Sequence, residues 1–373
     1  MERSGGESVA IYKTPRMKIG IVLHPYGEDK PAGLARTIFE FTKALVAYDT
    51  ENEYIIFLKK APRTIPDLPG RNWRIAVLGE GLLWLERLRH APPADIYVFN
   101  TPVMPLWWRP RRSVVLALDF AYKYFPPDDL AGRIRNRFME WYHGRSLRRA
   151  DRIIAMSDAT KKDVIRFFHI SEAKVAAVHW GFKKICDVAA ETVNVPSDFF
   201  LFVGVMKERK NVLNVVKGFR EFSRSHPRHA LVLCGKGEGE YVAKLKDYIR
   251  DEGVASRVIF PGYLTEGQVA YLYRHATALV FPSFVEGFGF PVLESMDCDT
   301  PVITSDCSSL AELGAGGAAV LVDPHQPDRI GAAMAMLADD KGLREEFIRR
   351  GSARAAEFVW EKRAPHFINA IIS

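Results

Sequence analysis

Short apolar segments alternate with amphipathic segments along almost the whole of this 373-residue chain. KIGIVLH, EYIIFL and ALVFPS are typical, and each is followed by residues with apolar positions at helical spacing. Continuous apolar runs of this length indicate strands that are buried on both faces, as in parallel sheets. The pattern therefore predicts an α/β protein built from repeated strand–helix units.

A chain of this length usually exceeds what one hydrophobic core holds, so two domains are expected. The best boundary is KKICDVAAETVNVPSD at 183–198, which lacks clear periodicity. We expect a Rossmann-like domain at 17–185, a linker at 186–198 and a second Rossmann-like domain at 199–357. Residues 1–16 have no apolar core or cleavage site of a signal peptide and are expected to form a disordered tail.

The positions of the strands decide where a site can lie, because ligands of doubly wound sheets bind beyond the carboxyl ends of the strands. Candidate residues are therefore sought in the loops that follow strands. The strands are expected at 18–24, 53–58, 73–78, 95–99, 113–119, 152–157, 174–180, 199–205, 230–235, 257–264, 278–283, 301–306 and 318–324. The clearest helices are expected at 34–48, 130–149, 159–168 and 212–223.

The loop after the strand FFLFVGV contains Arg209 and Lys210, with Asn211 as the expected N-cap of the next helix. Two cations beside a helix N-terminus form an anion site, because free backbone N–H groups and the helix dipole add to the side-chain charge. Taken alone, the loop fits an anion site and a solvated basic turn equally well.

The segment EGFGFPVLES follows the strand ALVFPS. Gly287 and Gly289 lack a Cβ atom, so the backbone there can approach a ligand closely. Pro291 suits the first helical position, which puts Glu294 in the first or second turn and Glu286 in the loop. The two carboxylates should flank a helix N-terminus without touching, which suits recognition of hydroxyl groups better than a coupled acid–base pair. A helix entry without a ligand is the alternative.

Three further positions are candidates. Gly33 precedes a helix after the first strand, where it could admit a phosphate or a sugar at close range or could be a simple turn glycine. Asp119 ends a strand and should face the cleft between the domains, where it could orient an acceptor hydroxyl; a buried structural aspartate is as good an interpretation. His179 is interpreted as a lone structural histidine.

Positive charge is concentrated in residues 101–150, where ten Lys and Arg oppose four Asp and Glu in a chain of net charge +7. Its densest part, 132–149, interleaves arginines with Phe138, Trp141 and Tyr142. A solvated helix face, contact with an anionic membrane and nucleic-acid binding would each fit. No nucleic-acid motif accompanies the charge, so no nucleic acid is expected as a partner.

The cysteines and acidic residues give no sign of a metal. Cys186, Cys234, Cys298 and Cys307 form no C-x-x-C pair and have no clustered histidines, so buried free thiols in a reducing compartment are expected. A structural zinc site is not expected, and no DxD-type metal motif follows a suitable strand.

Together these segments resemble glycosyltransferase family 4, the retaining group 1 glycosyltransferases with the GT-B fold. FLFVGVMKERKNVLNVVKGF is similar to the donor-phosphate segment of that family, FPSFVEGFGFPVLESMDCDTPVITSD to its E-x7-E segment, and RRADRIIAMSDATKKDV to the last helix–strand–helix of its N-terminal domain. The resemblance runs from about residue 17 to the end. It implies two Rossmann-like domains facing across a cleft, and a C-terminal helix at 358–373, around FVWEKRAPHF, that returns to the first domain.

The resemblance also implies individual roles around a nucleotide sugar. Glu294 would bind the ribose, and Glu286 with the backbone of Gly287, Phe288 and Gly289 would hold the hydroxyls of the transferred sugar.

Other roles concern the diphosphate, the base and the acceptor. Arg209 and Lys210 would neutralise the diphosphate, and Gly33 would lie against it from the other domain. Asp119 is the candidate for the acceptor side. The base pocket would be lined by Gly262, Tyr263 and Leu264.

The implied reaction is a retaining, metal-independent transfer of a hexose from a nucleoside diphosphate sugar to a lipid-linked or surface-glycan acceptor. Fixed cations would stabilise the departing diphosphate in place of a divalent metal, so no cofactor is expected. The MKERKN loop leans toward mannose or rhamnose. One departure concerns the His-Asp pair that family members often carry, because this chain has Leu118 before Asp119.

Two alternatives differ in class: a GT-B nucleotide-sugar epimerase, and a nucleotide-sugar binding protein that has lost activity. A cytoplasmic location is expected, with peripheral contact at the inner membrane face through 132–149. The sequence does not specify the base, the sugar, the acceptor, the linkage or the oligomeric state.

Overall fold

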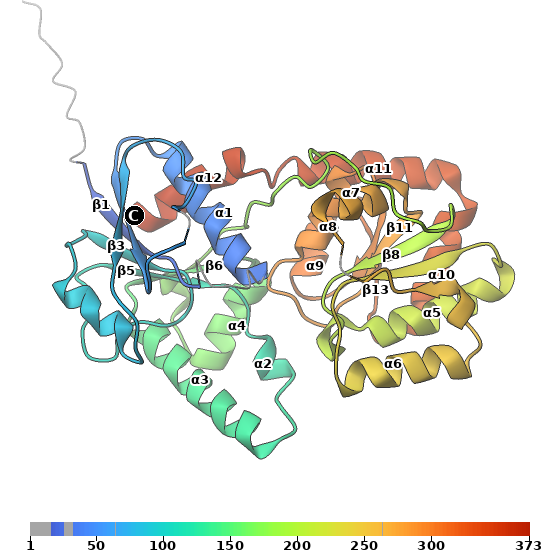
Figure 1. Cartoon of the computed structure of the whole chain (residues 1–373), viewed down its shortest axis with the longest axis horizontal. Helices are drawn as coiled ribbons and strands as arrows, with labels where there is room; N and C mark the ends of the chain where they lie inside the picture. Colours follow the sequence, from blue (N-terminus) through green and yellow to red (C-terminus); the bar gives the residue numbers. More distant parts are fainter. Residues whose placement is uncertain (1–15, 26–32, 64, 263) are drawn as a thin grey trace, which may run out of the picture.

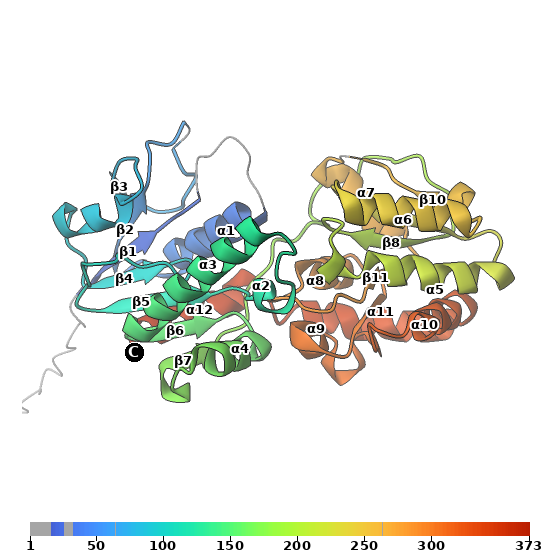
Figure 2. The same ribbon diagram turned by 90° about the horizontal axis from the view of Figure 1, so that it is seen from below.

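The computed structural model describes residues 16–25, 33–63, 65–262 and 264–373. This part of the chain forms two α/β lobes that lie side by side (Figure 1), each with helices packed against a parallel sheet (Figure 2). Apart from Arg16, the tail predicted at 1–16 lies outside the described residues.

The N-terminal lobe contains a seven-stranded parallel sheet in the order β3-β2-β1-β4-β5-β6-β7. Its strands are β1 (Lys18–Val22), β2 (Glu53–Leu58), β3 (Trp73–Val77), β4 (Ile96–Phe99), β5 (Ser113–Ala117), β6 (Arg152–Ala155) and β7 (Val175–Ala177). Its α-helices are α1 (Gly33–Tyr48), α2 (Ala121–Tyr124), α3 (Leu130–Arg149) and α4 (Asp158–Phe168). The seven strands predicted for this half are confirmed.

The C-terminal lobe contains a six-stranded parallel sheet in the order β10-β9-β8-β11-β12-β13. Its strands are β8 (Phe199–Val203), β9 (Ala230–Cys234), β10 (Val258–Ile259), β11 (Ala278–Phe281), β12 (Val302–Ser305) and β13 (Val320–Val322). Its α-helices are α5 (Val212–Ser225), α6 (Glu240–Asp251), α7 (Glu266–His275), α8 (Phe290–Asp297), α9 (Ser308–Leu313), α10 (Pro327–Asp339) and α11 (Lys341–Ala355). The six strands predicted here are confirmed, although β10 is much shorter than expected.

The strand order creates a switch point in each sheet. In the C-terminal lobe, β8 lies between β9 and β11, so the chain winds outward in opposite directions from this pair. The loops that follow β8 and β11 therefore emerge side by side at the carboxyl edge, where doubly wound sheets bind ligands. These two loops contain the Arg209–Lys210 pair and the EGFGFP segment.

Helix α5 holds the first of these loops in place. Its apolar stripe, predicted from helical spacing, is buried against the sheet. Asn211 stands at the N-cap position as expected, but it adopts a left-handed conformation and its side chain does not cap the helix. Its amide nitrogen donates instead to the carbonyl oxygens of Pro282, at 2.9 Å, and Pro324, at 2.6 Å. Asn211 thereby ties the loop after β8 to the loop after β11.

Helix α12 (Trp360–Ile372) ends the chain on the N-terminal lobe, where it is coloured red beside α1 (Figure 1). The rings of Phe41 in α1 and Phe367 in α12 lie 5.0 Å apart, and the Arg112 guanidinium donates to the carbonyl oxygen of Ile372. Two doubly wound lobes with a returning C-terminal helix are the architecture that the resemblance implied.

The cysteine prediction was wrong for two of the four residues. Cys186 in the linker and Cys298 at the end of α8 form a disulfide, with their Cα atoms 5.5 Å apart. Cys234 is free and buried, and Cys307 is free and half-buried. Because 112 residues separate the bonded pair, their spacing gave no sign that the linker passes the end of α8.

Candidate active site

A buried carboxylate and two cations meet at the switch point of the C-terminal sheet. Glu286 is 8% exposed, and its carboxylate accepts a hydrogen bond from the Arg209 guanidinium at 3.1 Å and another from the Lys210 ammonium. The Lys210 ammonium also lies 4.8 Å from the centre of the Phe281 ring at the end of β11. The sequence predicted these three residues as site members, and the structure joins them in one ion-paired cluster.

The cluster keeps its charges because they are paired. Burial raises the pKa of Glu286, but the charges of Lys210 and Arg209 lower it by more, so the pKa lies below its ordinary value. Burial lowers the pKa of Lys210, against the opposing effect of the Glu286 carboxylate. Leaving a buried charge of this network without a partner is strongly destabilising. An incoming anion would therefore compete with the Glu286 carboxylate for the same two cations.

The loop that carries Glu286 is held by its backbone. The Ser309 hydroxyl donates to the carbonyl oxygens of Glu286, at 3.0 Å, and Phe288, at 2.8 Å. Gly289 has a φ of 110°, a conformation that favours glycine, and α8 begins directly after it. Pro291 is the second helical residue, one position later than predicted.

The lack of a side chain at Gly287 has a structural reason that the sequence did not indicate. A Cβ atom at this position would overlap the carbonyl oxygen of Leu118, at the end of β5 in the other lobe. The missing side chain thus permits close contact between the two lobes. The Ser157 hydroxyl in the N-terminal lobe also donates to the Gly287 carbonyl oxygen, at 2.8 Å.

Glu294 lies apart from the cluster, as the sequence predicted. Its carboxylate accepts a hydrogen bond from the Tyr273 hydroxyl at 2.9 Å, and burial raises its pKa although this bond lowers it. It lines a cavity of about 210 Å³ together with Arg36 and Thr37 of α1 and Lys183. Because a pocket for a whole drug-sized ligand is usually about 300–1,000 Å³, this cavity suits one part of a larger ligand.

The remaining predicted donor positions are only partly described. Gly33 is the first residue of α1, and Gly262 has a φ of 79° in the segment between β10 and α7. Leu264 is half-buried, whereas Tyr263 lies outside the described residues. No contact in the described part of the chain joins these positions to the Glu286 cluster, so their roles stay predictions.

Asp119 lies at the lobe interface, since its Cβ atom is close to where a Gly287 side chain would be. Its side chain is exposed, and one carboxylate oxygen accepts the N–H of Ala121 at 3.1 Å. The prediction that it faces the space between the lobes agrees with this position, and the alternative of a buried aspartate is wrong.

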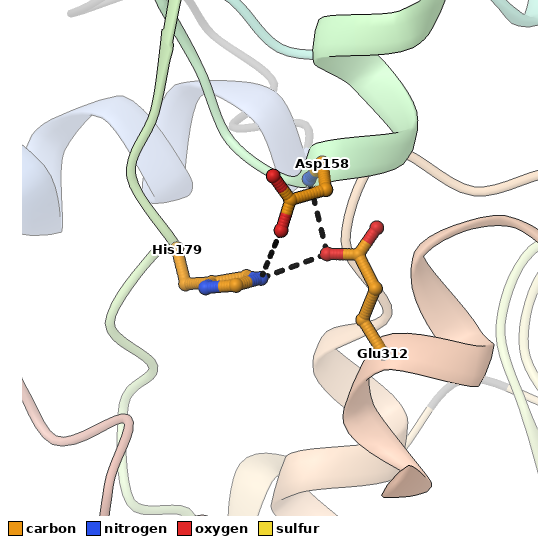
Figure 3. Close-up of side chains that lie close together, drawn as sticks. All are labelled: Asp158, His179 and Glu312. Carbon is orange, nitrogen blue, oxygen red and sulfur yellow. Dashed lines mark hydrogen bonds and ion pairs between the residues drawn. The ribbon is translucent and has the colours of Figure 1, made fainter.

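His179 is not the lone histidine that the sequence suggested. Its Nε2 atom lies 2.7 Å from a carboxylate oxygen of Glu312 in α9, and 3.9 Å from one of Asp158 in α4 (Figure 3). Glu312 and Ser157 were missed as candidates because neither belongs to a glycine-rich or basic loop after a strand. Only the contact between the lobes reveals them.

The site combines features that suit a sugar diphosphate. The two cations and the N-terminus of α5 can stabilise negative charge, and Glu286 and Glu294 can accept hydrogen bonds from hydroxyl groups. The carboxylates have separate partners, so the site is not built as a coupled acid–base pair.

Comparisons with known proteins point to one family. The family model for glycosyl transferases group 1 matches residues 187–354. The chain is 30% identical over 290 residues to the O-antigen chain mannosyltransferase B of Escherichia coli, with 74% of each chain covered. It is 26% identical over 207 residues to the O-antigen chain mannosyltransferase RfbU of Salmonella typhimurium strain LT2, with 56% of each covered.

Solved structures with the same fold cover nearly the whole chain. A sucrose-phosphate synthase from Thermosynechococcus elongatus superposes with a TM-score of 0.73 at 20% identity, covering 95% of this chain and 98% of that one. Anabaena HepE in complex with UDP and glucose gives a TM-score of 0.71 at 15% identity, covering 96% of this chain and 100% of that one. The fold is therefore the GT-B fold of two facing Rossmann-like domains.

Proposed function

Because the chain belongs to the group 1 glycosyltransferases, we propose that it transfers a mannosyl group from a nucleoside diphosphate mannose to a growing surface polysaccharide. The transfer retains the anomeric configuration and uses no divalent metal. The observation that carries this proposal is the Arg209–Lys210–Glu286 cluster at the carboxyl edge of β8 and β11.

The cluster supports a reaction in which a diphosphate departs. Breaking the anomeric C–O bond puts negative charge on the diphosphate and positive charge on the sugar ring. Arg209 and Lys210 are fixed cations that can bind the developing charge, which is the role a divalent metal has in other transferases. Glu286 lies beside them and can accept hydrogen bonds from the sugar hydroxyls.

The substrate class comes from the relatives. The two O-antigen enzymes are named as mannosyltransferases. The basic loop after β8 leans toward mannose or rhamnose, so it agrees with this sugar without selecting it. HepE was also solved in complex with UDP-glucose, so donor recognition within this fold includes nucleotide sugars. We therefore propose mannose as the transferred sugar and a lipid-linked or polysaccharide glycan as the acceptor.

A thermal-shift panel of UDP, GDP, TDP and their sugars identifies the donor, because a ligand that binds the folded state raises the unfolding temperature. The donor found in this way then enters an assay of transfer, in which excess EDTA tests metal independence and the anomeric configuration of the product tests retention.

We also propose that α3 docks on an anionic membrane at the cytoplasmic face. Four apolar side chains at helical spacing are exposed on it: Leu130, Ile134, Phe138 and Trp141 are 73%, 62%, 57% and 50% exposed. Exposed arginines alternate with them, and α3 forms the lower edge of the N-terminal lobe in Figure 1. An apolar stripe flanked by cations is typical of a helix that lies in a membrane interface. In the described part of the chain, no helix has the length and apolarity needed to cross a bilayer.

Replacing Phe138 by glutamate should abolish flotation with vesicles that contain phosphatidylglycerol, while the wild-type protein floats. The change removes an apolar anchor and adds a charge that anionic lipids repel; each basic residue near such a surface contributes about 1 kcal/mol. The matched control is Met336→Glu, an exposed apolar position on α10 in the other lobe. Equal binding of the wild type to neutral vesicles, or binding to neither kind, contradicts membrane docking by α3.

A further inference from the structure

The first turn of α4 in the N-terminal lobe is bound by a side chain from the C-terminal lobe. One carboxylate oxygen of Glu312 accepts the N–H of Asp158 at 3.0 Å (Figure 3). The other oxygen accepts the N–H of Ala159 at 2.7 Å. These N–H groups have no partner within their own helix, so Glu312 caps a helix that belongs to the other lobe.

The carboxylate of Glu312 is suited to this position. Burial raises its pKa, but the hydrogen bonds from His179 and the two backbone N–H groups lower it by more, so the pKa lies below its ordinary value. Asp158, His179 and Glu312 also have the side chains of a metal site. However, the N-terminus of α4 carries partial positive charge, and both oxygens of Glu312 already accept N–H groups. This setting favours a charged cap over a cation site.

The same turn of α4 contacts the loop that carries Glu286. The buried Ser157 hydroxyl donates to the Gly287 carbonyl oxygen at 2.8 Å, and its oxygen accepts the N–H of Thr160 at 3.1 Å. Residue 287 immediately follows Glu286, so Ser157 reaches the backbone of the sugar site from the opposite lobe.

Helix α9 joins the two contacts into one unit. It carries Glu312 near its end and Ser309 near its start, and Ser309 donates to the carbonyl oxygens on both sides of Gly287. Separation of the lobes would therefore remove the cap on α4 and the Ser157 bond to the loop in one step.

We propose that Glu312 and Ser157 are positioning residues that hold the Glu286 loop in its sugar-binding geometry only when the two lobes are closed. This inference rests on the proposed transferase function. Glu312 fixes α4 against α9, and Ser157 fixes the loop against α4. Neither residue needs to touch the substrate.

The test compares Glu312→Gln, Ser157→Ala and the double variant with Glu345→Gln, a change at an exposed position in α11. Glu312→Gln should lower kcat by about tenfold to a hundredfold, the range expected for losing a hydrogen bond with a charged partner. Ser157→Ala loses a hydrogen bond between neutral groups and should lower kcat by about twofold to tenfold. The affinity for the free nucleoside diphosphate should stay unchanged, since its cations lie in the C-terminal lobe. The fold-loss of kcat in the double variant should be no larger than the product of the two single losses. Glu345→Gln should match the wild type.

A second readout does not depend on catalysis. Small-angle scattering of the protein with bound nucleoside diphosphate should give a larger radius of gyration for the Glu312 and Ser157 variants than for wild type and Glu345→Gln. An unchanged kcat together with an unchanged radius overturns the inference, and so does a parallel loss of kcat, diphosphate affinity and unfolding temperature. If the wild type transfers no sugar, the proposed function fails, while the scattering comparison still decides whether these residues close the lobes.

Discussion

Glu286→Ala should reduce the rate of sugar transfer by about a hundredfold or more, since a sugar displaced from its reacting geometry commonly loses that much rate. The same change leaves the buried Lys210 without its carboxylate partner. Removing one member of a buried ion pair destabilises a protein by about 3–5 kcal/mol, so the unfolding temperature should fall as well. Initial rates at saturating donor and a denaturant unfolding curve measure the two effects.

Glu286→Gln separates the two effects, because it keeps the volume and one acceptor oxygen but removes the charge. The folded-state pKa of Glu286 is lowered, so its ion pairs stabilise the wild type above the ordinary pKa of 4.5, and this stability is lost as the pH falls through the folded value. The glutamine variant should lack that component of the acid dependence. Transfer by a folded Glu286→Ala protein at the wild-type rate would show that the sugar site has been assigned to the wrong residue.

Lys210→Met should lower kcat by about a hundredfold to a thousandfold, equal to about 3–4 kcal/mol of transition-state stabilisation. The ammonium group is buried beside Glu286 and can bind the charge that develops on the departing diphosphate. Methionine keeps much of the apolar stem and removes the ammonium group, which contacts Glu286 and lies 4.8 Å from the centre of the Phe281 ring. Single-turnover rates with the donor identified by thermal shift report the chemical step directly.

Lys207→Met is the matched control for this loop. Lys207 directly precedes the 3-10 turn formed by Glu208–Lys210 and is exposed, and in the described part of the chain it makes no hydrogen bond or ion pair with Glu286. It should retain the wild-type rate. Equal losses in the two variants would mean that the loop contributes a general positive field and that Lys210 has no specific place at the diphosphate.

The sequence predicted the fold well because parallel strands buried on both faces leave continuous apolar runs. FFLFV, ALVLC and ALVF are such runs, and they became β8, β9 and β11. The capping box of α7 is another local feature, because Thr265 and Gln268 are three residues apart and satisfy each other. These signals are local, so no tertiary contact is needed to detect them.

The parts of the site that depend on contacts between the lobes could not be predicted. Gly287 looked like a ligand-facing glycine, but its lack of a side chain accommodates the carbonyl of Leu118. No sequence motif marks Glu312, because its partners lie in α4, more than 150 residues earlier. The Cys186–Cys298 bond was hidden for the same reason. A sequence pattern reports which residues follow a strand, but not which surfaces of two lobes meet.

The most direct test of the account is the anomeric configuration of the product formed in the presence of EDTA. The purified protein is incubated with an α-linked nucleoside diphosphate mannose and a lipid-linked glycan acceptor, and the product is examined by NMR. We predict a new α-mannoside, formed at the same rate with and without EDTA. A β-mannoside, a complete loss of turnover with EDTA, or conversion of the donor without any glycoside product would contradict a retaining, metal-independent transferase.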